Sequence, residues 1–131
     1  MAHQVAREAL DAIIAEAARA APLEACGLLL GGEGRITEAR PCVNVAPSPE
    51  TRFEIDPQAL IDAHRAARAG GPALIGYYHS HPSGPPEPSP TDRAQAAGDG
   101  KAWAIVAQGH VRFWRDEADG FKPLSYTPVD A

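Results

Sequence analysis

Apolar and polar positions along the chain follow a helical period in three stretches. From Val5 to Ala20, apolar residues recur at helical spacing and charged residues occupy the other face, which predicts a helix that ends before the next proline. Asp56-Pro57 supplies an N-cap and a proline at the first helical position, so a second helix is expected from there to the following glycine pair. A short third helix is expected to begin at Ser89–Asp92 and to end near Ala97.

Strand patterns fill most of the chain between these helices. Ala73–Tyr78 is apolar and aromatic throughout, which is typical of a central strand. The other predicted strands are Cys26–Gly32, Arg35–Asn44, Arg52–Ile55, Trp103–Gln108, Val111–Arg115 and Phe121–Tyr126. Helices interspersed among strands predict an α/β (α+β) fold, and 131 residues without a long linker predict a single domain over residues 1–131.

Charge and cysteine content narrow the possible functions. A net charge of −5 gives no basic field for phosphate groups, so nucleic acid is not expected as the main partner. Cys26 and Cys42 are too few for a disulfide framework and are expected to be reduced thiols. The first residues lack a basic start and an apolar signal core, and no apolar run is long enough for a membrane span. A cytoplasmic location without membrane partners is therefore expected.

Candidate metal ligands follow the predicted central strand. His79 and His81 are two positions apart, so in an extended chain their imidazoles project to the same side. Asp92 can supply a third ligand if the proline-rich loop between residues 82 and 90 folds back. Two imidazoles, one carboxylate and one open position are typical of a catalytic zinc site, so one Zn²⁺ per chain is expected. The alternative is that this His-x-His pair occurs by chance.

Hydrolysis at such a site also needs a proton carrier and a hydrogen-bond donor. A zinc-bound water reaches a pKa of about 7, and a carboxylate beside the metal can take and return its proton. Glu24 is the candidate general acid/base, because it precedes an apolar strand where a charge is not expected. Ser89 can stabilise a developing oxyanion. Alternatively, Glu24 is an ordinary surface carboxylate, and Ser89 with Asp92 is only a helix cap.

Together these residues resemble the JAMM motif of the Mov34/MPN/PAD-1 metallopeptidases. That pattern is a glutamate, His-x-His, seven residues, Ser, two residues and Asp, and Glu24, His79, His81, Ser89 and Asp92 match each element. The likeness extends over about Val5 to Trp114 and includes Glu24–Gly31, Asn44 with Pro47, and Phe53–Pro57. It implies a curved mixed sheet flanked by helices, the MPN/JAB1 fold with its cytidine deaminase-like architecture. It also implies zinc binding by His79, His81 and Asp92, with Glu24 as general acid/base and Ser89 as transition-state donor.

The resemblance also implies a substrate class. The family hydrolyses peptide or isopeptide bonds, commonly after the Gly-Gly tail of ubiquitin or a ubiquitin-like protein. A chain of 131 residues has little room for the ubiquitin-gripping insertions of the eukaryotic members, so it is similar to the compact prokaryotic branch that processes sulfur carriers. The tail is expected to bind as an added strand between the Phe53 strand and the Pro82–Pro88 loop. The bond cleaved and the oligomeric state are left open.

Two other functions are compatible with parts of the motif. One is a non-catalytic scaffold like the inactive MPN domains, although those typically lose a histidine or the aspartate. The other is a RadC-like protein, because His81–Gly84 followed by Pro88-Ser89 is similar to the motif of that family. The Glu24-containing strand resembles the peptidase branch instead, and no helix-hairpin-helix region precedes it.

Overall fold

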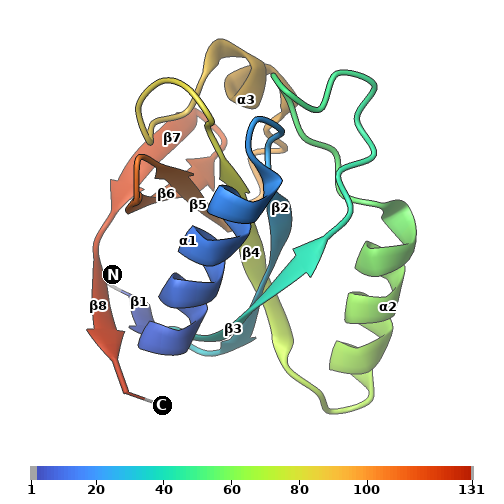
Figure 1. The fold of residues 1–131 in the computed structure, drawn as a ribbon. Coiled ribbons are helices and arrows are strands. Elements are labelled where there is room, and N and C mark those ends of the chain that lie inside the picture. The colour runs from blue at the N-terminus through green and yellow to red at the C-terminus, as the bar shows by residue number, and fades with distance from the viewer. Residues whose placement is uncertain (1–2, 131) are drawn as a thin grey trace.

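A mixed sheet of eight strands runs through the part of the chain that the structure describes, with helices packed on both of its faces (Figure 1). The computed structural model describes residues 3–130. The elements in chain order are β1 (His3–Ala6), α1 (Arg7–Ala20), β2 (Cys26–Gly32), β3 (Arg35–Cys42), α2 (Pro57–Arg68), β4 (Ala73–Ser80), α3 (Pro90–Gln95), β5 (Ala102–Ala107), β6 (His110–Glu117), β7 (Gly120–Leu124) and β8 (Tyr126–Val129). Among these helices, none is long and apolar enough to cross a membrane.

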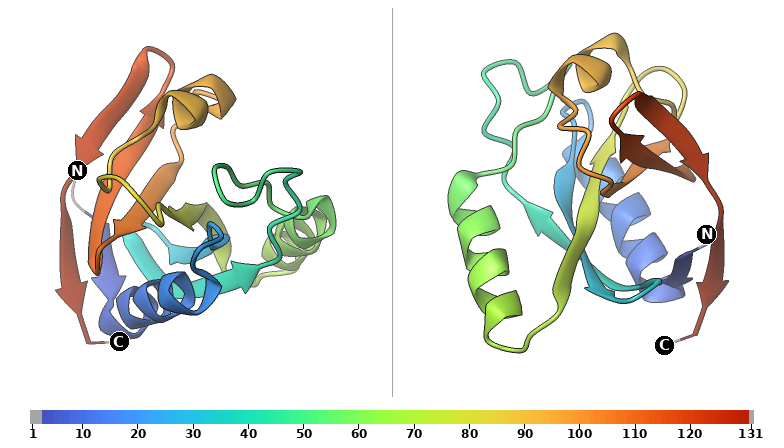
Figure 2. Two further views of the ribbon diagram at one scale, coloured as in Figure 1. Left: turned by 45° about the horizontal axis from the view of Figure 1, so that its top comes forward. Right: turned by 180° about the vertical axis from the view of Figure 1, so that it is seen from behind.

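The strand order places β4 in the interior of the sheet. The order is β7-β6-β5-β4-β2-β3-β1-β8, and β4 pairs antiparallel with β2 and parallel with β5. The sheet is strongly curved (Figure 2). Its two end strands, β7 and β8, are consecutive in the chain. These features confirm the expected α+β fold with a curved mixed sheet and a central strand over residues 73–78.

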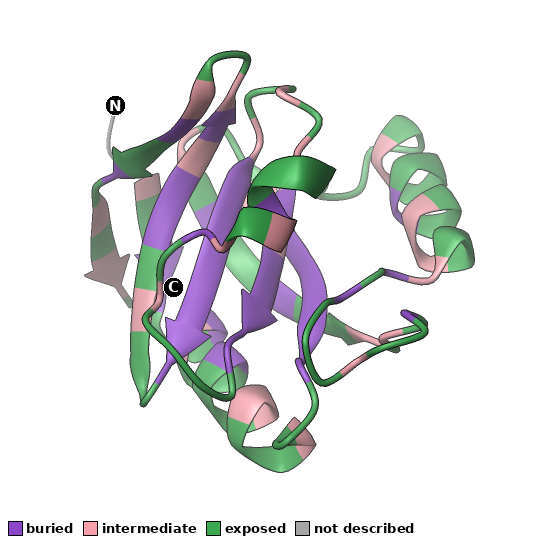
Figure 3. Cartoon of the chain, turned by 90° about the horizontal axis from the view of Figure 1, so that it is seen from above, coloured by how far each residue is buried: buried purple, intermediate pink, exposed green. Residues whose placement is uncertain are grey.

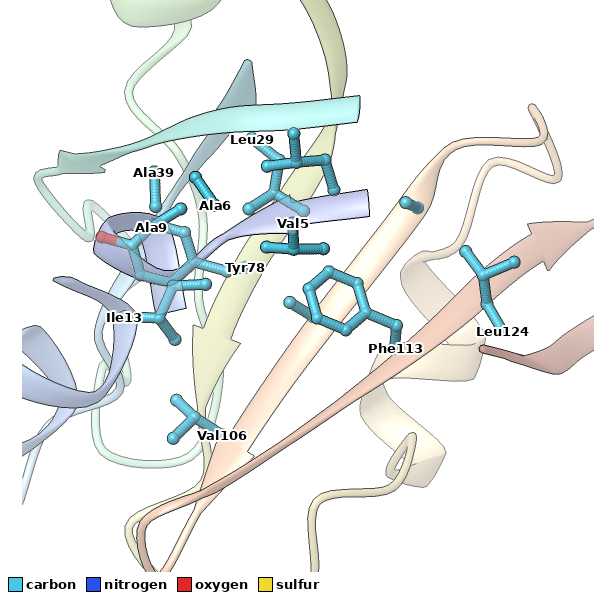
Figure 4. Packing of buried hydrophobic residues seen from close by; sticks show 13 residues of the cluster. Val5, Ala6, Ala9, Ile13, Leu29, Ala39, Tyr78, Val106, Phe113 and Leu124 are labelled. Carbon is cyan, nitrogen blue, oxygen red and sulfur yellow. The ribbon is translucent and has the colours of Figure 1, made fainter. Parts of the chain in front are cut away.

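Alternating side chains of the sheet form two hydrophobic clusters, one under α1 and one on the opposite face. On the α1 face, Ile13 of α1 packs with Leu29 of β2 and Tyr78 of β4 (Figure 4). On the other face, Ala63 of α2 belongs to the cluster that contains Leu28 and Trp103. The interior strands are therefore buried on both faces, as Figure 3 shows. This explains why their sequences are continuously apolar rather than alternating.

Gly76 allows β4 and β5 to lie close together. Gly76 pairs with Ala102 in the parallel ladder, and a Cβ atom at residue 76 would lie 1.8 Å from the Ala102 carbonyl oxygen. Only glycine avoids that overlap. The residue thus fixes the separation of the two strands a few residues before β4 reaches the candidate metal ligands.

Three expected elements differ in the structure. The first helix begins at Arg7, because residues 3–6 form β1, which pairs parallel with both β3 and β8. The expected strand Arg52–Ile55 is reduced to one bridge between Asn44 and Ile55, since the Asn44 side chain takes part in the bonding there. The expected last strand is two strands, β7 and β8, that pair with different neighbours.

Candidate metal centre

The candidate ligands meet at the carboxyl end of β4, where three loops gather at the top of Figure 1. His79 is the second-to-last residue of β4, and His81 directly follows the strand. Asp92 lies in the first turn of α3. Asp92 Oδ2 lies 3.1 Å from the Nε2 atom of each histidine. The two Nε2 atoms are 3.2 Å apart. The loop between His81 and Asp92 therefore folds back, which is the condition under which Asp92 can join the two histidines.

These separations fit a tetrahedral metal ion. Three ligand atoms about 2.0–2.1 Å from a zinc ion at tetrahedral angles are about 3.3 Å from one another. The three observed separations are equal within 0.1 Å, between 3.1 and 3.2 Å, and all three side chains are buried. Two buried imidazoles and a buried carboxylate that point at one spot form a group that can hold a shared cation.

Different contacts hold the two imidazoles in place. The His81 Nδ1–H donates to the Pro85 carbonyl oxygen at 2.8 Å, which leaves Nε2 as the lone-pair nitrogen that a metal requires. His79 is held by packing instead: its ring stacks on Phe53, with centroids 4.3 Å apart, and meets the Trp103 ring edge-on at 5.6 Å. Burial lowers the pKa of His79, so the ring is neutral, as a metal ligand must be.

Ser89 and Asp92 form the N-terminal cap of α3. The Asp92 N–H donates to Ser89 Oγ at 3.0 Å, and the Ser89 N–H donates to Asp92 Oδ2 at 2.9 Å. The expected helix cap is therefore present, and it orients the carboxylate toward the histidines. Burial raises the pKa of Asp92, but the close contacts with the His79 and His81 rings and the Ser89 N–H outweigh burial, and the net shift is strongly downward. Asp92 is thus an anion at neutral pH.

Glu24 is a buried carboxylate, which excludes the surface alternative. Only 6% of the residue is exposed, and its Oε1 atom has no hydrogen-bond partner in the described part of the chain. Burial raises the pKa of Glu24 to about 7, with a smaller opposing contribution from His81. A carboxyl group with that pKa can both accept and donate a proton near neutral pH.

One pocket of about 380 Å³ is lined by three of the five candidate residues. It is lined by Glu24, His81 and Ser89, together with Glu50, Thr51 and the loop from Pro82 to Thr91. The proline-rich loop forms one side, as expected. Phe53 does not form the other side, because its ring is buried against His79, and Glu50 and Thr51 of the preceding loop take that place.

Two residues of this region have contacts that the sequence pattern did not reveal. Ser80 lies between the two histidines, and its hydroxyl bonds the backbone beside Glu24. Asn44, noted in the sequence only as part of the resemblance, bonds five backbone groups of its surroundings. A lone serine or asparagine carries no periodic signal, so only the folded arrangement shows these contacts.

The protein has a curved mixed sheet with a His-x-His pair at the end of its central strand, and Asp92 of α3 lies against that pair. This combination defines a JAMM-type domain of the JAB1/MPN class. The chain belongs to the family described as prokaryotic homologs of the JAB domain, which it matches over residues 6–117. The resemblance seen in the sequence is thereby confirmed.

Relatives of the chain include several peptidases. The chain is 34% identical to a desampylase of Haloferax volcanii over 128 residues, which cover 92% of each chain. It is 41% identical over 92 residues to a probable TtuB-protein conjugate cleaving protease of Thermus thermophilus, covering 70% of this chain and 62% of that one. It is 35% identical over 85 residues to the CysO-cysteine peptidase of Mycobacterium tuberculosis, covering 63% and 58%.

Solved structures share the fold. The solution structure of protein DSY2949 from Desulfitobacterium hafniense matches with a TM-score of 0.84 at 25% identity, covering 98% of this chain and 93% of that one. AF2198, a JAB1/MPN domain protein from Archaeoglobus fulgidus, matches with a TM-score of 0.63 at 21% identity, covering 96% and 97%. The JAB1/MPN fold expected from the sequence is confirmed by these likenesses.

Proposed function

We propose that this protein is a zinc-dependent peptidase that hydrolyses a peptide or isopeptide bond after the Gly-Gly tail of a ubiquitin-like or sulfur-carrier protein. The observation that carries the proposal is Glu24: a buried carboxyl group with a pKa of about 7 and an unpartnered oxygen, in the pocket that also contains His81 and Ser89. A scaffold would gain nothing from such a group, because burying an unpaired carboxylate costs stability. The names of the relatives support the same substrate class.

His79, His81 and Asp92 would hold the zinc ion. When bound, zinc would supply a Lewis acid that polarises the scissile carbonyl and lowers the pKa of water. The His81–Pro85 and Asp92–Ser89 hydrogen bonds keep two of the three ligand side chains in the binding geometry. The neutral charge of His79 and the anionic charge of Asp92 are the protonation states that ligands need.

Glu24 and Ser89 would carry out the steps that belong to the protein. The Glu24 carboxylate takes a proton from the attacking water and then donates it to the departing amide nitrogen, so that one carboxylic acid and one amine leave the site. The Ser89 hydroxyl accepts from the Asp92 N–H, which leaves its hydrogen free to donate to the carbonyl oxygen as negative charge develops there.

Two variants test the proposal. We expect the parent to bind about one zinc per chain and to cleave a carrier extended beyond Gly-Gly or joined to a lysine, read by intact mass. Glu24→Gln is expected to abolish cleavage and to keep the zinc. Asp92→Asn is expected to lose both the zinc and the activity, while its amide oxygen can still accept from the Ser89 N–H in the capping box.

Distinct results would contradict each part of this proposal. A folded parent without zinc affinity would favour the scaffold function. Cleavage by Glu24→Gln at the rate of the parent would remove the assigned role of Glu24. Equal zinc affinity of Asp92→Asn and the parent would remove Asp92 from the ligand set.

A further inference from the structure

The position of Glu24 depends on parts of the chain that are far from it in sequence. Glu24 lies between α1 and β2, outside any helix or strand, so no regular ladder holds it. A group that transfers protons must nevertheless lie within hydrogen-bond reach of its target, and a misplacement of about 1 Å can cost about 100-fold in rate. The structure must therefore fix this segment by other contacts.

Ser80 holds the residue that follows Glu24. The Ala25 N–H donates to Ser80 Oγ at 2.7 Å, and the Ser80 N–H donates to the Ala25 carbonyl oxygen at 3.0 Å. Ser80 is 3% exposed and lies between His79 and His81. The reciprocal pair therefore ties the segment of Glu24 to the same three residues that carry two of the candidate metal ligands.

Asn44 holds Glu24 from the other side. Its Nδ2 group donates to the Glu24 carbonyl oxygen at 3.0 Å and to the Arg52 carbonyl oxygen at 3.1 Å, with a longer contact of 3.5 Å to Pro49. Its Oδ1 atom accepts from the N–H groups of Ala46 and Glu54 at 3.0 and 3.1 Å. One amide side chain thus joins the Glu24 backbone to both ends of the loop that contains Glu50 and Thr51.

A backbone contact completes this arrangement. The Glu24 N–H donates to the Pro49 carbonyl oxygen at 2.8 Å. Both backbone polar groups of Glu24 are consequently bonded to the loop over residues 44–54. Its carboxylate Oε1 has no hydrogen-bond partner among residues 3–130. The bonding fixes the main chain and leaves the carboxylate available to a substrate.

We propose that Asn44 and Ser80 are positioning residues that set the place of the Glu24 carboxylate relative to the metal centre. Ser80 fixes the Glu24 segment to the histidine-bearing end of β4, and Asn44 fixes it to the loop that lines the substrate pocket. The inference rests on the proposed function, because it assigns the two residues a role in the reaction that Glu24 performs.

Steady-state kinetics on the zinc-loaded full chain tests this role. We expect Asn44→Ala and Ser80→Ala to lower kcat about 10- to 100-fold per folded molecule, with KM changed less than about 3-fold. Ser80→Thr retains the hydroxyl and is expected to recover most of the kcat. Gln58→Ala and Ser125→Ala are the matched controls, because they truncate the same side-chain types at exposed positions away from Glu24.

Two further readouts separate positioning from general stability. Zinc affinity is expected to stay near that of the parent, and amide hydrogen exchange at Ala25 is expected to increase in Ser80→Ala. If Asn44→Ala does not fold, Asn44→Asp keeps the Oδ1 acceptor and places an oxygen against the Glu24 carbonyl, so the same fall in kcat is expected.

Some outcomes would overturn the inference. One is that Asn44→Ala and Ser80→Ala lower the melting temperature but leave kcat per folded molecule unchanged. The other is that they raise KM alone. Failure of the parent to cleave any carrier conjugate would instead overturn the proposed function itself, so the two failures are distinguishable.

Discussion

At the scale of single residues, the Glu24 carboxyl group affects both activity and folding stability. Its pKa lies at about 7 in the folded chain, compared with 4.5 for a solvated glutamate. A folded-state pKa above the unfolded value means that the folded protein holds the proton more tightly. The parent therefore loses stability as the pH rises from about 4.5 to about 7, and above that range the loss is complete.

This shift predicts the effect of Glu24→Gln on metal-free protein. Glutamine has the same shape without the charge. At pH 8, the free energy of unfolding of the variant is therefore expected to be about 2 kcal/mol larger than that of the parent, after allowance for solvent screening. Below pH 4.5 the two proteins should be nearly equal, because the carboxyl group is protonated in both states. Urea unfolding in EDTA at several pH values measures this difference.

The result has a clear opposite. If the difference in free energy of unfolding between Glu24→Gln and the parent is the same at pH 4 and pH 8, the Glu24 carboxylate is well solvated in the folded protein. Gln58→Glu serves as the control, since a carboxylate at that exposed helix position should show no comparable pH dependence.

The sequence was sufficient to predict the residues that meet at the site, and the reason is chemical. Imidazole and carboxylate groups are typical zinc ligands, so the sequence indicated that His79, His81 and Asp92 could form a ligand set if the loop folded back, and the structure brings the three together. The contacts of Asn44 and Ser80 could not be predicted, because both residues bond to backbone groups, and any sequence supplies those. Their partners depend on how the loops fold.

At the scale of elements, the contact between β4 and β5 determines where the metal centre forms. Gly76→Ala would place a methyl group 1.8 Å from the Ala102 carbonyl oxygen, in a ladder that is buried on both faces. We expect it to destabilise the protein by about 3 kcal/mol or more, because neither backbone can move without breaking the pairing. Denaturant unfolding measures the change.

Gly32→Ala is the matched control for this substitution. Gly32 also lies in a strand, at the end of β2, but a Cβ atom there meets nothing within 4 Å. Its stability should remain within about 0.5 kcal/mol of the parent. Similar losses of stability at both positions would show that the close approach of β4 and β5 is not the reason why residue 76 must be glycine.

Elements with a strong pattern were predicted well, and elements defined by their partners were not. β2 was predicted with its bounds, and β4 was predicted from its apolar run. The helical spacing that includes Val5 predicts a helix where the structure has β1, because nothing local reveals the parallel pairing of these residues with β3 and β8. Residues 52–55 alternate like a strand, but Asn44 supplies bonds that a neighbouring strand would otherwise make.

At the scale of the whole molecule, the two hydrophobic clusters share the same strands. β2, β4 and β5 each contribute side chains to both clusters, so neither cluster can be lost without exposing the other. We therefore expect metal-free protein to unfold in one transition. Tryptophan fluorescence, which reports on Trp103 and Trp114, should coincide in urea with far-ultraviolet circular dichroism.

Separate transitions would contradict this expectation. In particular, a fluorescence change that precedes the loss of secondary structure would mean that the cluster under α2 opens independently. EDTA is required in this experiment, because a protein with a tightly bound metal ion does not generally unfold in a two-state transition.

The return of the chain from His79 to Asp92 has a consequence for chain entropy. The two residues are 13 positions apart, and their ligand atoms are 3.1 Å apart. An ion held by both would close this segment into a ring, as a disulfide does, and a ring of about 15 residues is worth about 3 kcal/mol in the chain-entropy estimate. α3 has six residues, too few to persist alone, and its first turn lies at the closing point. The residues that would bind the ion would thus also tether this helix, so that the order of the Ser89 region depends on the same ring.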